Sequence, residues 1–190
     1  MSTVAIILAA DSGSGFVGPK YLADIRGKPM LQWVVDSCMD WPVEERIVVL
    51  GSEADRIVDA VDFGDMTVVI DSEWSEGSAS PLRAALDLAS RDQSVSACVI
   101  ARGDQPDVKA STVAALLEVA ADTEADTVVP KYRYASGWPI ILDYSIWEHL
   151  LAAEGSVDLP AVAASHATSP EQVWFDHLPP KTYESPDDFA

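Results

Sequence analysis

Residues 4–20, VAIILAADSGSGFVGPK, are the stretch of this sequence that decides the fold. The stretch opens on a β-branched and apolar run, Val4 to Leu8, which is short and uninterrupted enough to be a strand buried on both faces. Small and turn-forming residues follow as far as Gly15. Because glycines let backbone N–H groups approach a ligand closely, such a loop at the carboxyl end of a buried strand is typical of a phosphate site. We therefore predict a nucleotide-phosphate site over residues 8–20, with Lys20 supplying a positive charge.

Residues 13–18, GSGFVG, also spell the G-x-G-x-x-G pattern of a dinucleotide-binding βαβ unit. That unit needs a helix that opens directly on the glycines and an acidic residue about 20 residues further on, at the end of the second strand. Gly27, Lys28 and Pro29 would break such a helix early, and the next strand pattern, over residues 46–50, lies too far along the chain. The context therefore disfavours a dinucleotide site.

The same stretch resembles the opening of the MobA/MocA-like nucleotidyltransferases, whose pattern is LAAGxGxRMGxxK followed by a GKPLL-type segment. The matching residues are Leu8-Ala9-Ala10, Gly13, Pro19-Lys20 and Gly27-Lys28-Pro29-Met30-Leu31. The departures that bear on the site are at three positions: Asp11 and Val17 stand where the family has Gly, and Gly15 stands where it has Arg. In the family that Arg helps to neutralise the charge of the triphosphate, so its absence bears on catalysis more than on the fold.

Enzymes of this family transfer a nucleoside monophosphate from CTP or GTP to a phosphorylated acceptor such as molybdopterin, with release of pyrophosphate. The resemblance implies the same reaction here, with Mg²⁺ as cofactor and a molybdopterin-like cofactor or a sugar phosphate as acceptor. A chain that kept the fold while the loop decayed would instead be a non-catalytic nucleotide-binding or regulatory protein. The sequence leaves that alternative open.

The length and composition of the chain limit the class of protein to which it can belong. A chain of 190 residues suits a single nucleotidyltransferase-like domain spanning residues 1–190. No apolar run approaches the length of a membrane span and the N-terminus has no secretory pattern, so we expect a cytoplasmic protein. The formal charge of −19 disfavours binding to nucleic acid or to anionic membrane. Cys38 and Cys98 lie in apolar patterns and are expected to be reduced core residues.

Strand and helix patterns alternate along the chain. Strand patterns cover residues 4–8, 46–50, 66–70, 95–101 and 127–130, and helix patterns cover residues 29–39, 52–61, 80–89 and 111–121. Ser52, Ser80 and Ser111 are candidate N-caps of three of these helices. The alternation predicts an α/β protein with three α/β/α layers and a mostly parallel, mixed sheet. The resemblance implies that this is the Rossmann-like, GT-A-like fold of the nucleotidyltransferases.

Ligands of an open parallel sheet gather beyond the carboxyl ends of its strands, which directs attention to the segments that follow them. Residues 71–82 resemble the N-x-x-W-x-x-G-x-x-x-S-L segment of MocA-like enzymes, in which this loop borders the nucleotide. Asp71 is alternatively an ordinary strand-end turn residue. With the first loop, the resemblance implies these nucleotide-binding residues: Leu8, Ala9, Ala10, Ser12, Gly13, Lys20, Asp71, Gly77 and Ser80.

The segment Gly103-Asp104-Gln105-Pro106 follows the fourth strand pattern and matches the family's GD-M/Q-P motif. A carboxylate at the end of a buried strand can hold Mg²⁺ against the phosphates of a triphosphate, since Mg²⁺ prefers oxygen ligands. The resemblance implies catalytic roles for Asp104, as metal ligand, and for Lys20, as phosphate contact. Residues 181–189 resemble the closing segment of the family, where an Asp or Asn assists the metal, and Glu184 is the nearest carboxylate.

The remaining candidates lie on the expected acceptor side. Residues 136–142 resemble the family's GHPV-L strand with Trp138 in place of His, so Trp138 either lines an acceptor pocket or packs in the core. Residues 153–156 fall near the family's GDxG acceptor loop, without its Asp. A local basic cluster suits an anionic acceptor and comprises Lys131, Tyr132 and Arg133. Two arginines are candidates to replace the missing charge of the first loop, Arg26 and Arg83.

Overall fold

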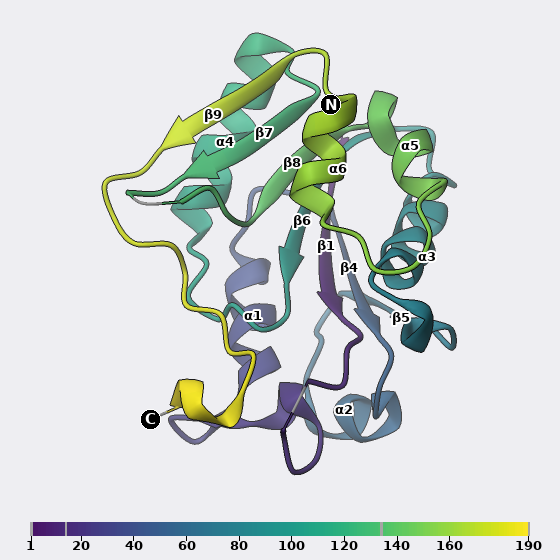
Figure 1. Cartoon of the computed structure of the whole chain (residues 1–190), viewed down its shortest axis with the longest axis vertical. Helices are drawn as coiled ribbons and strands as arrows, with labels where there is room; N and C mark the ends of the chain where they lie inside the picture. The colour runs from purple at the N-terminus through teal and green to yellow at the C-terminus, as the bar shows by residue number, and fades with distance from the viewer. Residues whose placement is uncertain (1, 14, 134, 190) are drawn as a thin grey trace.

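A computed structural model describes residues 2–13, 15–133 and 135–189 (Figure 1). Its main sheet has seven strands in the order β5-β4-β1-β6-β8-β7-β9. These strands are β1 (Ser2–Ala9), β4 (Glu45–Leu50), β5 (Thr67–Ile70), β6 (Val95–Arg102), β7 (Thr127–Lys131), β8 (Ile140–Asp143) and β9 (Pro170–Trp174). Only β8 runs antiparallel to its neighbours, β6 and β7, within the described residues. The prediction of a mostly parallel, mixed sheet is confirmed.

Helices cover both faces of this sheet, as Figure 1 shows. The helices are α1 (Met30–Met39), α2 (Ala54–Ala60), α3 (Ala79–Ala89), α4 (Ala110–Thr123), α5 (Trp147–Leu151) and α6 (Leu159–His166). Alternate residues of β1 enter two separate cores. Ala5 and Ile7 pack with α1, α2 and α4, whereas Val4 and Ile6 pack with α3, α5 and α6. A strand buried on both faces is thus the centre of three layers, as its uninterrupted apolar run predicted.

Short elements complete the chain. A two-stranded ribbon is formed by β2 (Asp24–Ile25) and β3 (Lys28–Pro29), and single 3₁₀ turns are η1 (Lys20–Leu22), η2 (Trp74–Glu76), η3 (Tyr144–Ile146) and η4 (Pro186–Phe189). Cys38 and Cys98 are buried and unpaired, as expected. None of the helices within the described residues has the length and apolar character that crossing a bilayer requires.

The three predicted serine caps were wrong. Helix α2 begins at Ala54 after Glu53, whose backbone is left-handed with φ of 58°, and no side chain caps it. Helices α3 and α4 begin at Ala79 and Ala110, one residue before Ser80 and Ser111. The start of α3 is fixed by tertiary contact instead, because the backbone N–H of Ala79 donates to the carbonyl of Gly155 at 3.0 Å. Tertiary contacts of this kind override a local capping preference.

Candidate active site

The first loop begins after β1, at the carboxyl edge of the sheet, and ends where η1 begins at Lys20. Figure 1 shows the course of the chain here. No helix opens on the glycines of this loop within the described residues, so the dinucleotide-binding pattern has no structural counterpart. Gly103, at the end of the neighbouring strand β6, donates its backbone N–H to the carbonyl of Leu8 at 2.8 Å. A Cβ on Gly103 would lie 2.7 Å from that of Ala9, so the two strand ends meet this closely only because Gly103 is a glycine.

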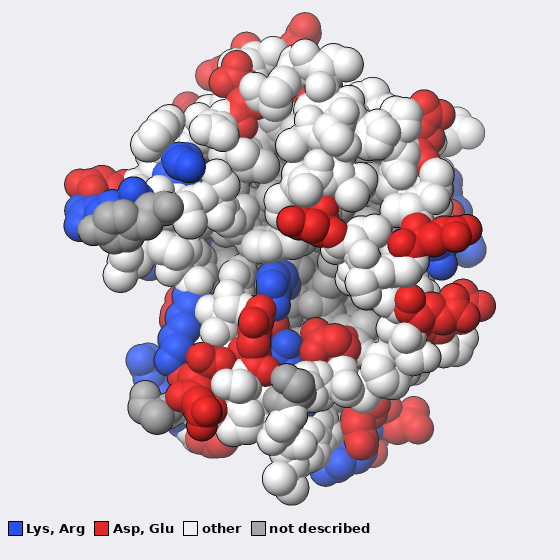
Figure 2. Space-filling view, viewed as in Figure 1, with Lys and Arg blue, Asp and Glu red and all other residues white. Residues whose placement is uncertain are grey.

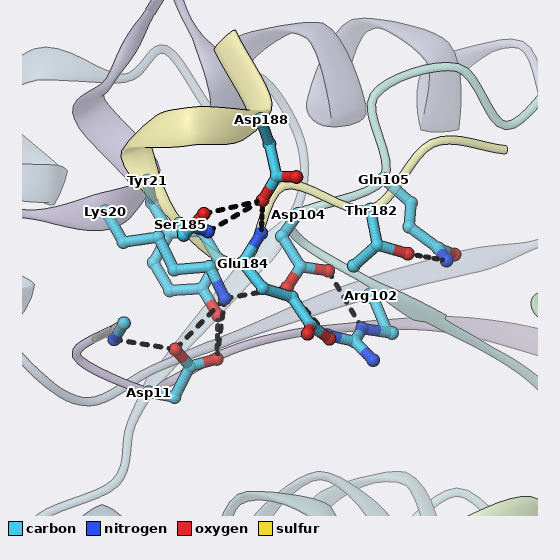
Figure 3. Close-up of polar contacts among 11 residues, drawn as sticks. Asp11, Lys20, Tyr21, Arg102, Asp104, Gln105, Thr182, Glu184, Ser185 and Asp188 are labelled. Atoms are coloured by element: carbon cyan, nitrogen blue, oxygen red, sulfur yellow. Dashed lines mark hydrogen bonds and ion pairs between the residues drawn. The ribbon is translucent and has the colours of Figure 1, made fainter. Parts of the chain in front are cut away.

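Lys20 lies at the centre of a cluster of charged side chains (Figure 3). Its ammonium nitrogen Nζ is 2.7 Å from Oδ2 of Asp104 and 3.1 Å from Oδ1 of Asp11. The side chains of Lys20 and Asp104 are only 4% and 2% exposed. The stem of Lys20 passes beneath Gly13, where a Cβ would lie 2.7 Å from the Cδ of Lys20. The structure thus brings together Lys20 and Asp104, the two residues to which the resemblance assigns catalytic roles.

The carboxylate of Asp11 accepts hydrogen bonds from groups that the sequence analysis expected to bind phosphate, a backbone N–H of the first loop and the Lys20 ammonium. Its Oδ1 accepts the backbone N–H of Gly13 at 2.8 Å as well as the Lys20 ammonium, and its Oδ2 accepts the hydroxyl of Tyr21 at 2.6 Å. Burial raises the pKa of Asp11, but the hydrogen bond from Tyr21 and the charge of Lys20 outweigh burial and leave the pKa below its ordinary value. The carboxylate of Asp11 is therefore charged at neutral pH and holds the first loop closed on Lys20.

Arg102 is a member of the site that the sequence analysis missed. Its Nε and Nη2 donate to the two oxygens of Asp104 at 2.9 and 2.8 Å, and Nη2 also donates to Oε1 of Glu184 at 3.0 Å. Burial lowers the pKa of Arg102, and the bonds to Asp104 and Glu184 more than reverse this effect, so the guanidinium is firmly charged. Its position directly before the Gly103-Asp104 motif was the available signal, because a residue that ends the strand before the motif must lie near the motif's carboxylate.

Neither arginine named as a replacement for the missing loop charge makes a hydrogen bond or ion pair with the described residues of the loop. Arg26 is exposed on the turn between β2 and β3, where its φ is 56°. Arg83 donates to the carbonyl of Ala153 at 2.7 Å.

The C-terminal segment, residues 181–189, runs beside the first loop and contacts the site (Figures 1 and 3). The backbone N–H of Tyr183 donates to the carbonyl of Asp104 at 3.0 Å. Asp188 accepts the N–H groups of Glu184 and Ser185, which fixes the turn that carries Glu184 to Arg102. The side chain of Glu184 is 67% exposed. Glu184 and Asp104 are thus brought together across one shared guanidinium.

Two cavities meet at this cluster, and Figure 2 shows charged side chains around a hollow in this face. The first, which we call the β6 cavity, measures about 230 Å³ and is lined by Leu8, Asp11, Tyr21, Ser78, Leu82, Arg102, Asp104, Trp138, Val157 and Leu159. The second, the loop cavity, measures about 320 Å³ and is lined by Leu8, Ala10, Asp11, Ser12, Trp74, Ser75, Gly77, Ser78, Pro81 and Ser156. Leu8, Asp11 and Ser78 border both cavities, so a ligand in one would adjoin a ligand in the other.

The expected nucleotide-binding residues divide into two groups. Leu8, Ala10, Ser12 and Gly77 line the loop cavity. The residues outside both linings are Ala9, Gly13, Lys20, Asp71 and Ser80. Asp71 accepts the N–H of Glu73 at 2.9 Å, which is the turn role that the sequence left open.

The candidates for the acceptor side do not lie together: Trp138 lines a cavity of the site, and the basic cluster does not. Trp138 lines the β6 cavity and packs against the core formed with α3, α5 and α6. The basic cluster lies elsewhere, since Arg133 pairs with Asp176 at 2.6 Å, Tyr132 is fully buried and Lys131 is a residue of β7 outside both cavity linings.

The model of the MobA-like NTP transferase domain family matches residues 5–170. The chain belongs to this family. Curated relatives of the MobA-like protein include the bifunctional protein GlmU of Lactococcus lactis, which is 31% identical over 120 residues, or 62% of this chain and 25% of GlmU. The 3-deoxy-manno-octulosonate cytidylyltransferase of Coxiella burnetii is 30% identical over 113 residues, or 60% of this chain and 44% of that enzyme. The chain therefore matches only a quarter to under a half of these relatives' lengths.

The fold of this MobA-like protein also occurs in solved structures. The Mycobacterium tuberculosis protein Rv0371c superposes with a TM-score of 0.88 at 22% identity, covering 99% of this chain and 95% of that one. A second structure of Rv0371c is a complex with manganese and superposes with a TM-score of 0.84 at 22% identity, covering 100% of this chain and 96% of that one. At this identity the likeness shows that the fold is shared.

Proposed function

We propose that this MobA-like protein is a Mg²⁺-dependent nucleotidyltransferase with residues 1–190 as its catalytic domain. It transfers a nucleoside monophosphate from CTP or GTP to a phosphorylated small molecule, a molybdopterin-like cofactor or a sugar phosphate, and releases pyrophosphate. The observation that carries this proposal is the buried contact of Lys20 with Asp104, a residue that lines the β6 cavity, beyond the carboxyl ends of β1 and β6. The family membership of the chain supports the same reaction class.

The loop cavity is the proposed nucleoside site. Leu8, Ala10, Ser12 and Gly77 line it, and Trp74 gives it an aromatic wall. Ala9 contributes as the buried residue that ends β1 and positions the loop. Asp71 lies at the end of β5, and its buried Oδ2 has no hydrogen-bond partner among the described residues, which favours it as an acceptor for ribose or base. Ser80 and Gly13 have indirect roles in this proposal. Ser80 lies in the first turn of α3, and Gly13 leaves room for the side chain of Lys20.

Asp104 and Glu184 are the proposed metal ligands. Mg²⁺ is usually held by one or two carboxylates together with water and substrate phosphates. Asp104 lines the β6 cavity and Glu184 shares the Arg102 guanidinium with it, so the two carboxylates would suit such an ion once it displaces their bonds to Lys20 and Arg102. Within the described residues, His, Cys, Asp and Glu side chains form no group of three that could hold a metal. When bound, the ion would neutralise phosphate charge and polarise the α-phosphate. The manganese complex of Rv0371c supports the use of a divalent ion in this fold.

The side chains of the site then serve mainly to position groups and to balance charge, which is most of what phosphoryl-group transfer needs. An oxygen of the acceptor phosphate forms a bond to the α-phosphorus, and the bond from that phosphorus to the β-bridging oxygen breaks. Lys20 balances the negative charge that collects on the departing pyrophosphate. Arg102 keeps Asp104 in place through two parallel hydrogen bonds.

One observation favours the second candidate function, a non-catalytic nucleotide-binding or regulatory protein. The carboxylate of Asp11 already accepts from the Gly13 N–H and the Lys20 ammonium, the donors that a phosphate would use. A triphosphate must displace this carboxylate before it reaches Lys20. The transferase therefore requires that a triphosphate displace Asp11 and then react, whereas the non-catalytic candidate requires no reaction.

A thermal-shift screen of the purified chain against CTP, GTP, ATP and UTP, each with and without Mg²⁺, tests the proposal. A ligand at about 100 times its Kd adds roughly 2.7 kcal/mol to the free energy of unfolding. Each kcal/mol raises the Tm of a chain this size by about 2–4 °C. We expect a Mg²⁺-dependent rise with CTP or GTP. No rise with any nucleotide would favour the non-catalytic candidate.

Replacement of Asp11 by Gly, the residue of the family pattern, is expected to raise the affinity for CTP or GTP about tenfold, or roughly 1.4 kcal/mol. The substitution removes a negative charge from the phosphate position and frees the Gly13 N–H, and Asp104 still pairs with Lys20. The Asp11 side chain is 58% exposed, so solvent screening keeps the gain modest. Calorimetric titration measures it, with the exposed Asp92→Asn as charge-matched control. Unchanged or weaker binding in Asp11→Gly would contradict the expectation.

A further inference from the structure

The β6 cavity has a charged end and an apolar body. Six of its ten lining residues are apolar or aromatic: Leu8, Tyr21, Leu82, Trp138, Val157 and Leu159. Leu82 of α3 and Leu159 of α6 are 1% and 4% exposed, so packing holds these two walls in place. The charged lining residues are Asp11, Arg102 and Asp104, which belong to the cluster around Lys20. A ligand that fills this cavity therefore meets charge at one end and hydrocarbon along its length.

The hydroxyl groups in these walls are already used. The hydroxyl of Ser78 donates to the carbonyl of Val157 at 3.1 Å and accepts its N–H at 2.9 Å. The hydroxyl of Tyr21 donates to Asp11. A sugar carries several hydroxyls, and each one buried without a partner weakens binding by about fivefold or more. The walls are thus poorly suited to a polyhydroxylated body.

Arg102 is the cation at the charged end. Among the ten lining residues it is the only Lys or Arg, and its side chain is 31% exposed. Its Nε and Nη2 bind Asp104 and Glu184, whereas Nη1 donates to no described residue. A planar guanidinium with an unused donor at a cavity wall suits a phosphate oxygen. The alternative basic cluster around Arg133 does not line this cavity.

We propose that the acceptor is a small phosphate monoester with an apolar or aromatic body, whose phosphate binds Arg102 and whose body packs against Leu82, Trp138 and Leu159. This inference rests on the proposed function and selects among its acceptors, against sugar phosphates. The cavity of about 230 Å³ lies below the usual 300–1,000 Å³ of sites for drug-sized ligands, which limits the acceptor to a small body.

The nucleotidyl transfer needs no reactant other than the nucleoside triphosphate and the acceptor. An oxygen of the acceptor phosphate, largely deprotonated at neutral pH, supplies the electron pair for the new bond to the α-phosphorus. The bond between that phosphorus and the β-bridging oxygen breaks, and pyrophosphate leaves with the electron pair. The product joins the nucleoside monophosphate to the acceptor through a P–O–P linkage.

The test measures pyrophosphate release by the full chain with Mg²⁺, the nucleotide that raises its Tm, and either phenyl phosphate or glucose 1-phosphate. We expect kcat/KM to be at least tenfold higher with phenyl phosphate. Val157→Ser, which adds a hydroxyl to the wall and leaves the Val157 backbone bonds to Ser78 intact, should lower this preference at least threefold.

Trp138→Ser should raise KM for phenyl phosphate at least tenfold and leave KM for the nucleotide unchanged. The matched control is Trp174→Ser, because Trp174 is 72% exposed on β9 and lines neither cavity. An unaltered KM for phenyl phosphate in both Trp138→Ser and Val157→Ser would overturn the inference.

The outcomes separate this inference from the proposed function. A higher kcat/KM with glucose 1-phosphate overturns the inference and leaves the transferase standing. If the nucleotide raises the Tm but no pyrophosphate appears, tryptophan fluorescence titration with phenyl phosphate in the presence of the nucleotide decides, and absence of binding overturns the inference. Failure of every nucleotide to raise the Tm removes the basis of both proposals.

Discussion

Asp104→Asn is expected to lower kcat/KM for pyrophosphate release by about 10²–10³, because metal-assisted charge stabilisation contributes several kcal/mol to such a transition state. The substitution keeps the size of the side chain and removes the charge that would hold the cation. The variant should still fold, since Lys20 keeps its bond to Asp11 and Arg102 keeps its bond to Glu184. Loss of the Mg²⁺-dependent part of the nucleotide thermal shift should accompany the loss of turnover.

Asp107→Asn is the matched control for this experiment, because Asp107 lies three residues further along the same loop and is exposed. Its kinetics should equal those of the unaltered chain. A Mg²⁺-dependent thermal shift of full size in Asp104→Asn would contradict the assignment of Asp104 as metal ligand. Equal losses in both variants would show that the loop is sensitive to any change of charge.

The central part of the fold could be predicted because its sequence carries one unambiguous signal. β1 and β6 are buried on both faces over most of their length, so uninterrupted apolar runs fill residues 4–9 and 97–101. Runs this short, rich in β-branched residues and followed by turn-forming residues, favour a buried strand. The edge strand β9 has no such signal. Four of its five residues are exposed, and Pro170 opens it, so neither alternation nor an apolar run marks it as a strand.

The site was predictable only where a motif marked it. Lys20 and Asp104 came from family patterns, and the structure places them 2.7 Å apart. The roles of Asp11 and Arg102 depend on tertiary geometry. Arg102 reaches Glu184 only because the C-terminal segment returns to the end of β6, and 82 positions separate the two residues in the sequence.

Backbone packing explains why the prediction of Ser80 as the N-cap of α3 was wrong. A Cβ at Gly77 would lie 2.3 Å from the carbonyl carbon of Gly155, so two backbones in direct contact set the start of α3. Sequence patterns within one segment cannot reveal contact between two distant backbones. The same contact places Ser78 between the two cavities, where its hydroxyl is bonded to Val157.

Lys20→Met is expected to lower the free energy of unfolding by about 3 kcal/mol, near the lower end of the range for breaking a buried ion pair. Asp104 is 2% exposed and would lose its Lys20 partner, but it would keep both bonds from Arg102, which is why the lower end applies. Methionine retains most of the stem that packs beneath Gly13, so the loss reports the charge more than the packing. Chemical denaturation measures the change.

Lys28→Met is the control for that measurement, because Lys28 makes an ion pair with Asp36 in which the two side chains are 33% and 47% exposed. An exposed pair contributes at most about 1 kcal/mol, so this variant should lose far less stability. The double variant Lys20→Met with Asp104→Asn should cost less than the sum of the single variants, because it leaves no unpaired buried charge of that pair. Equal losses in Lys20→Met and Lys28→Met would contradict a structural role for the buried pair and would leave Lys20 with the phosphate role alone.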